Sequence, residues 1–222
     1  MGSAGRDPDA AQELARLYWK PIYAYIRAAR RLGNEEAKDL CQDFFLWMME
    51  SDFLSKADRD RGRFRVYVKG AVKFFLSNEL RKLHRQKRGG RRAILSLHQG
   101  PEDLELWELP DPASKSPDEA LDEVWKKTLF TRACSLLEER FTAEGKTVCF
   151  QVFRDYFLSG GREMDYKEVA AKYGITVVAV SNYLMEAKRR FRGALSDLVA
   201  ETVQTPEDLR EELRALLGES GP

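Results

Sequence analysis

The chain has 222 residues, enough for one large domain or two small ones, and a formal net charge of +1. Apolar residues make up 43% and charged residues 33%, which is typical of a folded protein with a heavily charged surface. No apolar run approaches the roughly 20 residues that a membrane span needs. Residues 1–11 also lack the apolar core of a signal peptide, so a cytoplasmic protein without a membrane partner is predicted.

The small net charge is the sum of four blocks whose net charges alternate in sign. Residues 1–92 carry 21 Lys/Arg against 12 Asp/Glu, a net of +9, and residues 93–125 carry one against nine, a net of −8. Residues 126–198 have a net charge of +4, and residues 199–222 a net charge of −4. Two basic blocks joined by an acidic connector indicate a polyanionic partner such as nucleic acid.

The N-terminal block has the apolar spacing of helices. One stripe runs from Leu14 to Ile26, and the same spacing predicts helices over residues 35–49 and 64–84, with a polar, turn-rich segment between them. The second helix has Asp39 and Asp43 four residues apart, hence on one face. No histidine or third carboxylate is placed to complete a metal or acid–base site there. An acidic face that docks a basic partner is therefore the favoured interpretation.

Aromatic and basic residues interleave over residues 63–88. Base stacking on aromatic rings beside a basic track is how many proteins hold single-stranded nucleic acid. An apolar stripe on the same helix makes the core the simpler location for any single aromatic, and it leaves open whether Phe74 is a core or a strand-contacting residue. The face as a whole predicts contacts with single-stranded nucleic acid by Arg63, Arg65, Tyr67, Lys73, Phe74, Arg81 and Lys82.

Residues 93–117 contain several prolines and no sustained helical stripe, so they are predicted to form a flexible acidic linker. Ser116 and Pro117 then open a new helix as its cap and first residue. Helical patterns cover residues 119–142, 146–158, 165–173, 176–197 and 206–217, and strand alternation persists nowhere. An all-α protein is predicted.

Residues 166–185 have the spacing of a helix-turn-helix. Ala170 allows the two helices to cross closely, Gly174 can adopt the left-handed conformation at the turn, and Thr176 can cap the second helix. Five apolar residues at matching places would hold the helices together: Val169, Tyr173, Ile175, Val180 and Tyr183. A plain helical hairpin with a solvated basic end is the alternative, but the number of matching places favours a helix that reads duplex DNA. Its predicted contacts are Thr176, Val177, Val178, Ser181, Asn182, Met185, Lys188 and Arg189.

The order of these features resembles the bacterial extracytoplasmic-function sigma factors. The resemblance covers about residues 10–198 and rests on DLCQDFF, the aromatic–basic helix, the linker, and YKEVAAKYGI followed by VSNYLMEAKRRFRGAL. It implies a first domain over residues 8–92 that docks on core RNA polymerase through Asp39, Gln42 and Asp43. The same domain would recognise and melt the minus-ten element of DNA, with Asn78 added to the strand contacts named above. It also implies a linker over residues 93–117, a helix-turn-helix domain over 118–198 that reads the minus-thirty-five element, and a helical extension over 199–222.

A sigma factor directs core polymerase to promoter DNA, so no catalytic residue, metal or cofactor is expected. The chain departs from the family pattern at Phe74, where an Asn is usual, at Tyr67, where a Trp is usual, and at Asn78, where an Asp is frequent. The extension over residues 202–217 resembles that of subgroups thought not to depend on a classical anti-sigma factor, and whether an anti-sigma or other regulatory partner exists stays open.

Two other functions compete with this prediction. A stand-alone helix-turn-helix regulator would bind duplex DNA without polymerase, but it leaves the second basic–aromatic block unexplained. A nuclease would need a metal cluster or a nucleophile–base pair, and the two histidines are isolated. The three cysteines are far apart and beside apolar residues, so buried free thiols are predicted.

Overall fold

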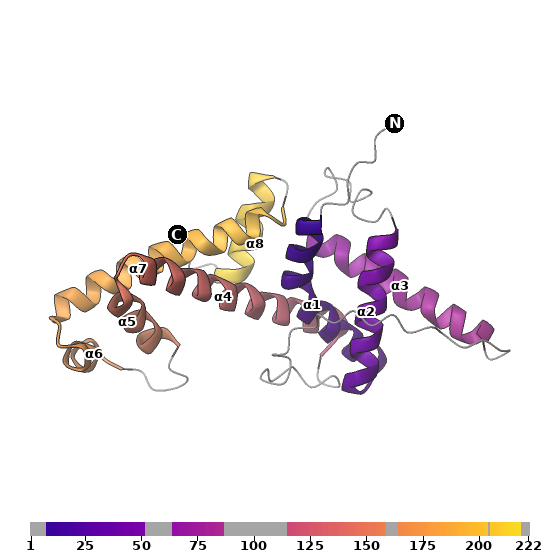
Figure 1. Cartoon of the computed structure of the whole chain (residues 1–222), viewed down its shortest axis with the longest axis horizontal. Helices are drawn as coiled ribbons and strands as arrows, with labels where there is room; N and C mark the ends of the chain where they lie inside the picture. Colours follow the sequence, from indigo (N-terminus) through magenta and orange to yellow (C-terminus); the bar gives the residue numbers. More distant parts are fainter. Residues whose placement is uncertain (1–7, 52–63, 87–114, 159–163, 204, 219–222) are drawn as a thin grey trace. The chain divides into compact units, whose positions relative to one another are not determined.

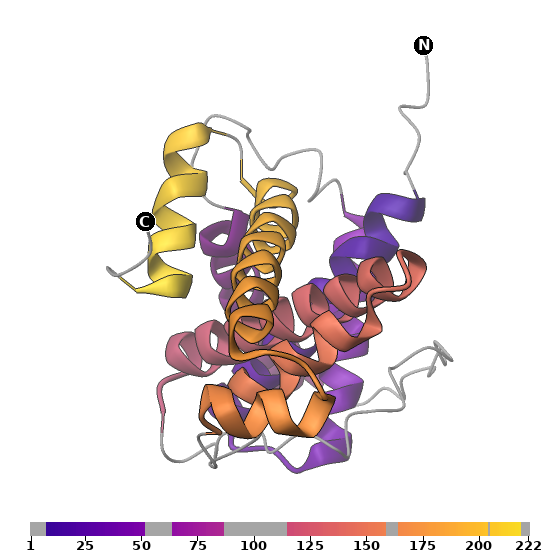
Figure 2. The same ribbon diagram turned by 90° about the vertical axis from the view of Figure 1, so that its left-hand side faces the viewer.

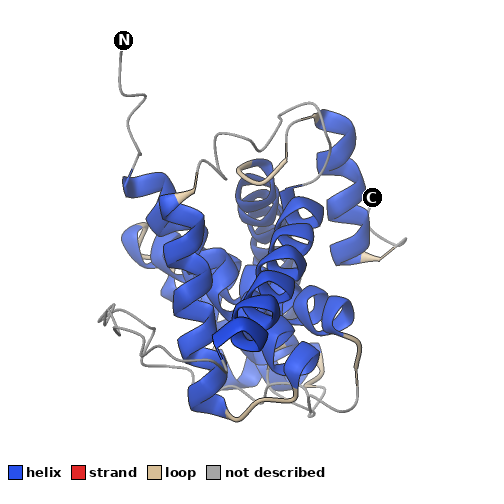
Figure 3. Cartoon of the chain, turned by 90° about the vertical axis from the view of Figure 1, so that its right-hand side faces the viewer, coloured by secondary structure: helices blue, strands red, loops and turns tan. Residues whose placement is uncertain are grey.

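The computed structural model describes residues 8–51, 64–86, 115–158, 164–203 and 205–218. Within these ranges every regular element is a helix (Figure 3), which confirms the predicted all-α class. The helices are α1 (Pro8–Arg30), α2 (Asn34–Glu50), α3 (Phe64–Gln86), α4 (Pro117–Ala143), α5 (Thr147–Phe157), α6 (Tyr166–Tyr173), α7 (Val177–Ala200) and α8 (Pro206–Leu217). The ranges predicted for α2 to α8 agree with these bounds to within three residues at each end, whereas α1 extends beyond the predicted stripe from Leu14 to Ile26 on both sides.

None of the described helices has an apolar stretch long enough to cross a lipid bilayer.

The chain divides into two compact units, residues 1–128 and residues 129–222. The first unit contains α1, α2, α3 and the start of α4, and the second contains the rest of α4 and the helices that follow it (Figure 1). The start of α4 therefore packs with the N-terminal helices.

The core of the first unit is largely aromatic. α1 packs against α2 and α3, and the side chains of Tyr18, Ile22 and Phe44 are almost completely buried. The rings of Phe44 and Phe75 meet edge to face, with centroids 5.5 Å apart. Such pairs add about 0.5–1.5 kcal/mol to what burial alone contributes. This packing fixes the side of α3 that faces inward and so fixes which of its residues reach solvent.

The start of α4 is attached to the first unit by apolar and ionic contacts. Ala120 and Val124 pack against Ala24 of α1. The acidic side chain of Asp122 binds two basic residues of α3, accepting a hydrogen bond from the Arg65 guanidinium and one of 2.7 Å from Lys69 Nζ. Part of the basic charge of α3 is therefore neutralised within this unit.

The second unit is built around α7. The α5 and α6 helices both pack against α7, and Leu137, Phe141, Phe150, Val152 and Leu184 are among its buried core residues. Figure 2 shows α6 beside the N-terminal end of α7. At the other end of α7, α8 packs along the helix, and its first turn is capped by Thr205, whose hydroxyl accepts a 3.0 Å hydrogen bond from the Asp208 amide.

Two of the three cysteines, Cys41 and Cys149, are buried free thiols, as predicted, and Cys134 is half-buried. Burial raises the pKa of the Cys149 thiol to about 11, and it raises the pKa of Cys41 well above its ordinary value. Because the thiolate is the reactive form, these two side chains act as small apolar core residues.

Candidate nucleic-acid interface

Local hydrogen bonds fix the start of α6 and both ends of the turn between α6 and α7. At the start of α6, Asp165 accepts a 2.8 Å hydrogen bond from the Glu168 amide, and the Glu168 carboxylate accepts one of 3.1 Å from the Asp165 amide. Gly174 ends α6 with a φ of 63°, a left-handed conformation that side chains rarely adopt. Thr176 begins α7, and its hydroxyl accepts a 3.1 Å hydrogen bond from the Ala179 amide. The angle at which the chain enters α7 is thus set by local hydrogen bonds.

The seam between α6 and α7 contains the residues that the spacing predicted. Val169, Ala170 and Val180 are buried in the core of the second unit. The three remaining predicted residues pack against that core with partly buried side chains: Tyr173, Ile175 and Tyr183. The predicted inward face of this helix pair is confirmed, and it determines which side of α7 faces outward.

A hydrogen bond also ties α6 to α5. The Tyr173 hydroxyl donates a 2.5 Å hydrogen bond to Asp155 Oδ2, and Lys172 binds the same carboxylate. Burial, together with this hydrogen bond, raises the pKa of Tyr173 to about 12. Burial alone would raise the pKa of Asp155, but the hydrogen bonds from Lys172 and Tyr173 outweigh it, and the net shift is downward. Tyr173 therefore stays a neutral donor and holds α6 in place.

The outward face of α7 makes few contacts within the unit. Val178 and Met185 are 70% and 64% exposed, although both are apolar. Val177 and Asn182 are also exposed, and Ser181 is half-buried. Exposed apolar side chains on a well-packed helix are informative because folding alone gives them no role. In protein–DNA complexes such side chains contact the methyl group of thymine, and an Asn contacts adenine.

The basic residues that follow on α7 differ in what they contact. Arg189 is exposed and has no ion-pair partner within the part of the chain that the structure describes. Lys188 is exposed too, with its ammonium group 4.8 Å from the centre of the Phe157 ring. Arg190 instead turns toward Glu144 and Glu186 and binds both. Arg189 and Lys188 therefore remain as candidate phosphate contacts.

Comparison with known proteins found no family model, curated protein or solved structure that matches this chain. Besides the outward face of α7 in the second unit, the first unit carries a surface on α3 and an acidic face on α2.

The outward side of α3 brings together most of the predicted single-strand contacts. Lys73, Phe74 and Arg81 are exposed, and Tyr67 and Asn78 are half-buried. Positions 67, 74, 78 and 81 follow the three- and four-residue spacing of one helical face. Two predicted contacts cannot be placed, since Arg63 and the side chain of Lys82 lie outside the described residues.

Phe74 is not a core residue. Its side chain is 57% exposed, whereas the adjacent Phe75 is 4% exposed. The Phe74 ring lies beside Trp47 of α2, with ring centroids 6.1 Å apart, and Trp47 also contacts Phe75 at 5.7 Å. Phe74 and Trp47 together form an aromatic ledge at the surface. Trp47 was not among the predicted contacts, although its place between the inward-facing Phe44 and Met48 was the available signal.

Arg65 lies apart from the other predicted contacts on α3. It is only 9% exposed, donates a hydrogen bond to Asp122, and has its guanidinium 4.4 Å from the centre of the Trp125 ring. The carboxylate and the aromatic ring both stabilise the positive charge of the Arg65 guanidinium within the protein. Burial thus separates Arg65 from the exposed Lys73 and Arg81.

The three candidate polymerase contacts share one side of α2. Asp39 is exposed, and Gln42 and Asp43 are half-buried. Their spacing on an uninterrupted helix places Asp39 and Asp43 next to each other along the axis. A carboxylate pair of this kind suits a basic protein surface.

Proposed function

We propose that the chain is an extracytoplasmic-function-type sigma factor that binds core RNA polymerase in the bacterial cytoplasm and directs it to specific promoters. In this proposal α6 and α7 form a helix-turn-helix whose second helix reads the minus-thirty-five element. The outward side of α3, with its aromatic ledge, holds the melted minus-ten strand. The acidic side of α2 docks on the polymerase. The chain supplies no catalytic group of its own.

The observation that carries the proposal is the outward face of α7. Val178, Asn182 and Met185 lie on the exposed side of a helix whose opposite side is buried against α5 and α6. Arg189 follows one turn later on the same side. Residues able to contact base edges come first and a phosphate-binding cation comes after them, which is the order that a recognition helix in the major groove requires.

The surface on α3 favours a sigma factor over a stand-alone helix-turn-helix regulator. A regulator that only binds duplex DNA has no use for an exposed phenylalanine, packed on a half-buried tryptophan, beside the exposed cations Lys73 and Arg81. A protein that captures unpaired bases does, because stacking on an aromatic ring contributes about 1–3 kcal/mol per base. The α2 carboxylates add a surface for a protein partner, which a sigma factor also requires.

The decisive experiment is in vitro transcription with bacterial core RNA polymerase on a fragmented genomic template, with and without the purified chain. We expect the chain to bind core polymerase and to produce discrete transcripts that share an upstream sequence. The stand-alone regulator predicts the reverse, with tight sequence-specific binding to duplex DNA by the free chain and no new transcripts. That second result would overturn the sigma-factor proposal while leaving α7 as a DNA-reading helix.

A further inference from the structure

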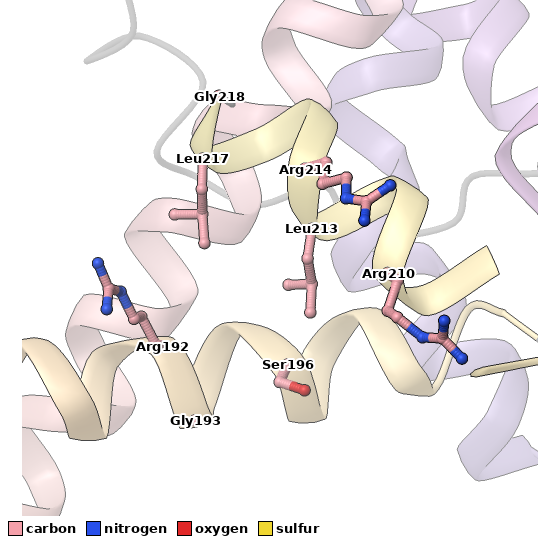
Figure 4. A pocket seen from close by; sticks show the side chains of 8 residues that line it. All are labelled: Arg192, Gly193, Ser196, Arg210, Leu213, Arg214, Leu217 and Gly218. Carbon is pink, nitrogen blue, oxygen red and sulfur yellow. The ribbon is translucent and has the colours of Figure 1, made fainter. Parts of the chain in front are cut away.

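The proposed function leaves α8 without a role, and the structure has a pocket between α8 and α7. It has a volume of about 400 Å³ and is lined only by residues of the second unit. Figure 4 shows Leu213 and Leu217 pointing from α8 toward α7, with Arg192 and Arg210 on two sides of the opening. Arg214 completes the lining from α8.

The lining combines an apolar floor with cationic sides. Leu213 and Leu217 are half-buried and Arg192, Arg210 and Arg214 are exposed, and no acidic residue contributes to the pocket wall that the structure describes. Arg210 binds Glu207 at 2.8 Å, an exposed pair of the kind that contributes little. Arg192 and Arg214 have no ion-pair partner among the described residues. Three guanidinium groups around two leucines are complementary to a ligand that carries carboxylates beside apolar side chains.

Gly193 lies at this pocket, on α7. Glycine in the interior of a helix is unfavourable relative to alanine, and neither packing nor backbone geometry requires one here. An added Cβ would have no heavy atom within 4 Å, and the residue is part of a regular helix. Gly193 is among the residues that line the pocket, and because an added Cβ would meet no heavy atom within 4 Å, a larger side chain at this position has open space to occupy at the pocket.

We propose that the pocket between α7 and α8 is a docking site for an acidic amphipathic helix of a partner protein. The partner inserts leucine-like side chains between Leu213, Leu217 and Gly193, and its carboxylates pair with the three arginines. Guanidinium groups suit carboxylates because they donate parallel hydrogen bonds to both oxygens. A small anion alone would leave the apolar floor uncovered, and nucleic acid would bring phosphates but no branched aliphatic side chain to fill it. The site is separate from the DNA and polymerase surfaces proposed above and does not depend on them.

The test uses the full chain and a fluorescein-labelled synthetic helix of about 15 residues, long enough for measurable helicity. The peptide consists of Glu, Leu and Ala, with the leucines on one side and the glutamates beside them. A second peptide has Lys in place of Glu. Fluorescence anisotropy should show binding of the acidic peptide and none of the basic one. Equal binding of both peptides, or of neither, overturns the proposal.

Three variants locate the binding. Gly193→Leu fills the floor without changing the charge, and it should weaken acidic-peptide binding about tenfold or more, as loss of a central contact does. The Arg210→Glu/Arg214→Glu double variant should weaken it at least as much. Lys167→Glu is the control, because Lys167 is an exposed cation of the same unit on α6, away from the pocket, and it should leave binding unchanged.

Other occupants give different results. If Gly193→Leu binds the peptide as wild type does while the arginine variant does not, the attraction is diffuse charge and the pocket proposal is wrong. If millimolar pyrophosphate displaces the peptide and a leucine-free Glu/Ala helix binds equally well, the site holds a small anion instead. If the double arginine variant fails to fold, the Gly193→Leu variant still tests the pocket proposal. Leucine is a better helix former than glycine, so the melting temperature of the Gly193→Leu variant should not fall.

Discussion

Arg190 holds Glu144 through two parallel hydrogen bonds, from Nη1 to Oε1 at 2.6 Å and from Nη2 to Oε2 at 2.9 Å. The guanidinium also lies 4.7 Å from the centre of the Phe141 ring and binds Glu186 at 2.6 Å. These contacts fasten the middle of α7 to the turn that follows α4. The preceding residue, Arg189, is exposed instead, so two adjacent arginines have different physical roles.

This difference predicts opposite phenotypes for two alanine variants. Arg189→Ala should weaken binding to all promoter sequences alike and should reduce the slope of log affinity against log salt by about 1, as loss of one phosphate contact does. Its melting temperature should match that of wild type. Arg190→Ala should lower the melting temperature. If Arg190→Ala is as stable as wild type, the network around Glu144 does not hold α7.

The same network predicts acid sensitivity. The hydrogen bonds from Arg190 lower the pKa of Glu144 from its ordinary value of 4.5 to about 2. A pKa lower in the folded than in the unfolded state means that the ionised carboxylate stabilises the fold above about pH 4.5, and that this stabilisation is lost as the pH falls from 4.5 through 2. Glu144→Gln should therefore be less stable than wild type at neutral pH.

The Gln variant should also lose less stability than wild type between pH 4.5 and 2, measured by urea unfolding at each pH. Both partners reach solvent, so the effect is modest. Lys146 and Glu186 belong to the same network, and the carboxyl pKa of Glu186 is lowered as well, chiefly by the hydrogen bond from Lys146. Parallel curves for Glu144→Gln and wild type would show that Glu144 does not cause the acid sensitivity.

The outward face of α7 predicts base-specific effects. Asn182→Ala and Met185→Ala should each change the preference at one or two positions of the upstream promoter element by about 1–3 kcal/mol. Both side chains are exposed, so thermal stability should be unchanged. Selection of bound sequences from a random duplex library measures the preference. A uniform loss of affinity for every sequence, like that expected of Arg189→Ala, would contradict the proposed position of α7 in the major groove.

Phe74 and Phe75 form a matched pair for testing strand capture. Phe74→Ala should leave thermal stability and closed-complex affinity nearly intact and should sharply reduce open-complex formation. A template with a pre-melted bubble should restore transcription, because its bases are already unpaired and no free energy is needed to unstack them. Phe75→Ala should instead destabilise the fold by about 3–5 kcal/mol. A stable Phe74→Ala variant with normal open complexes would exclude the aromatic ledge from the DNA site.

The acidic side of α2 predicts a defect that leaves the fold intact. Reversing both charges in Asp39→Lys/Asp43→Lys should weaken co-purification with core RNA polymerase, while the helical circular dichroism spectrum stays native. Exposed charges are individually weak, so we expect each single variant to have a small effect. Normal association of the double variant with core polymerase would place the polymerase contact elsewhere.

The helices could be predicted from the sequence because one side of each helix is apolar. The period of Val68, Val72 and Phe75 determines the inward side of α3 without knowledge of what packs against it. The role of single charged residues could not be predicted in the same way. Arg65 lies three residues before Val68, on the inward side, but the partners that hold its charge there, Asp122 and Trp125, lie far along the chain and could not be predicted from that spacing.

The same limit applies to Phe74 and Trp47. For Phe74 the sequence left open a core or a strand-contacting position, and for Trp47 it gave no prediction, because the exposure of both rings depends on how α2 and α3 cross. The caps of α4 and α7, Ser116 and Thr176, could be predicted because each depends on residues within one turn. Interactions over short sequence distances were thus readable from the sequence, and contacts between α3 and α4 were not.

The exposure of Val178, Asn182 and Met185 has an evolutionary consequence. Because these side chains add little to the packing of the second unit, exchanging them changes folding stability by only a few tenths of a kcal/mol. The buried side of the same helix, with Val180, Leu184 and Ala187, has no such freedom. Gene duplicates of this protein could therefore acquire new binding preferences through a few substitutions while retaining their scaffold, and the two sides of α7 should diverge at different rates.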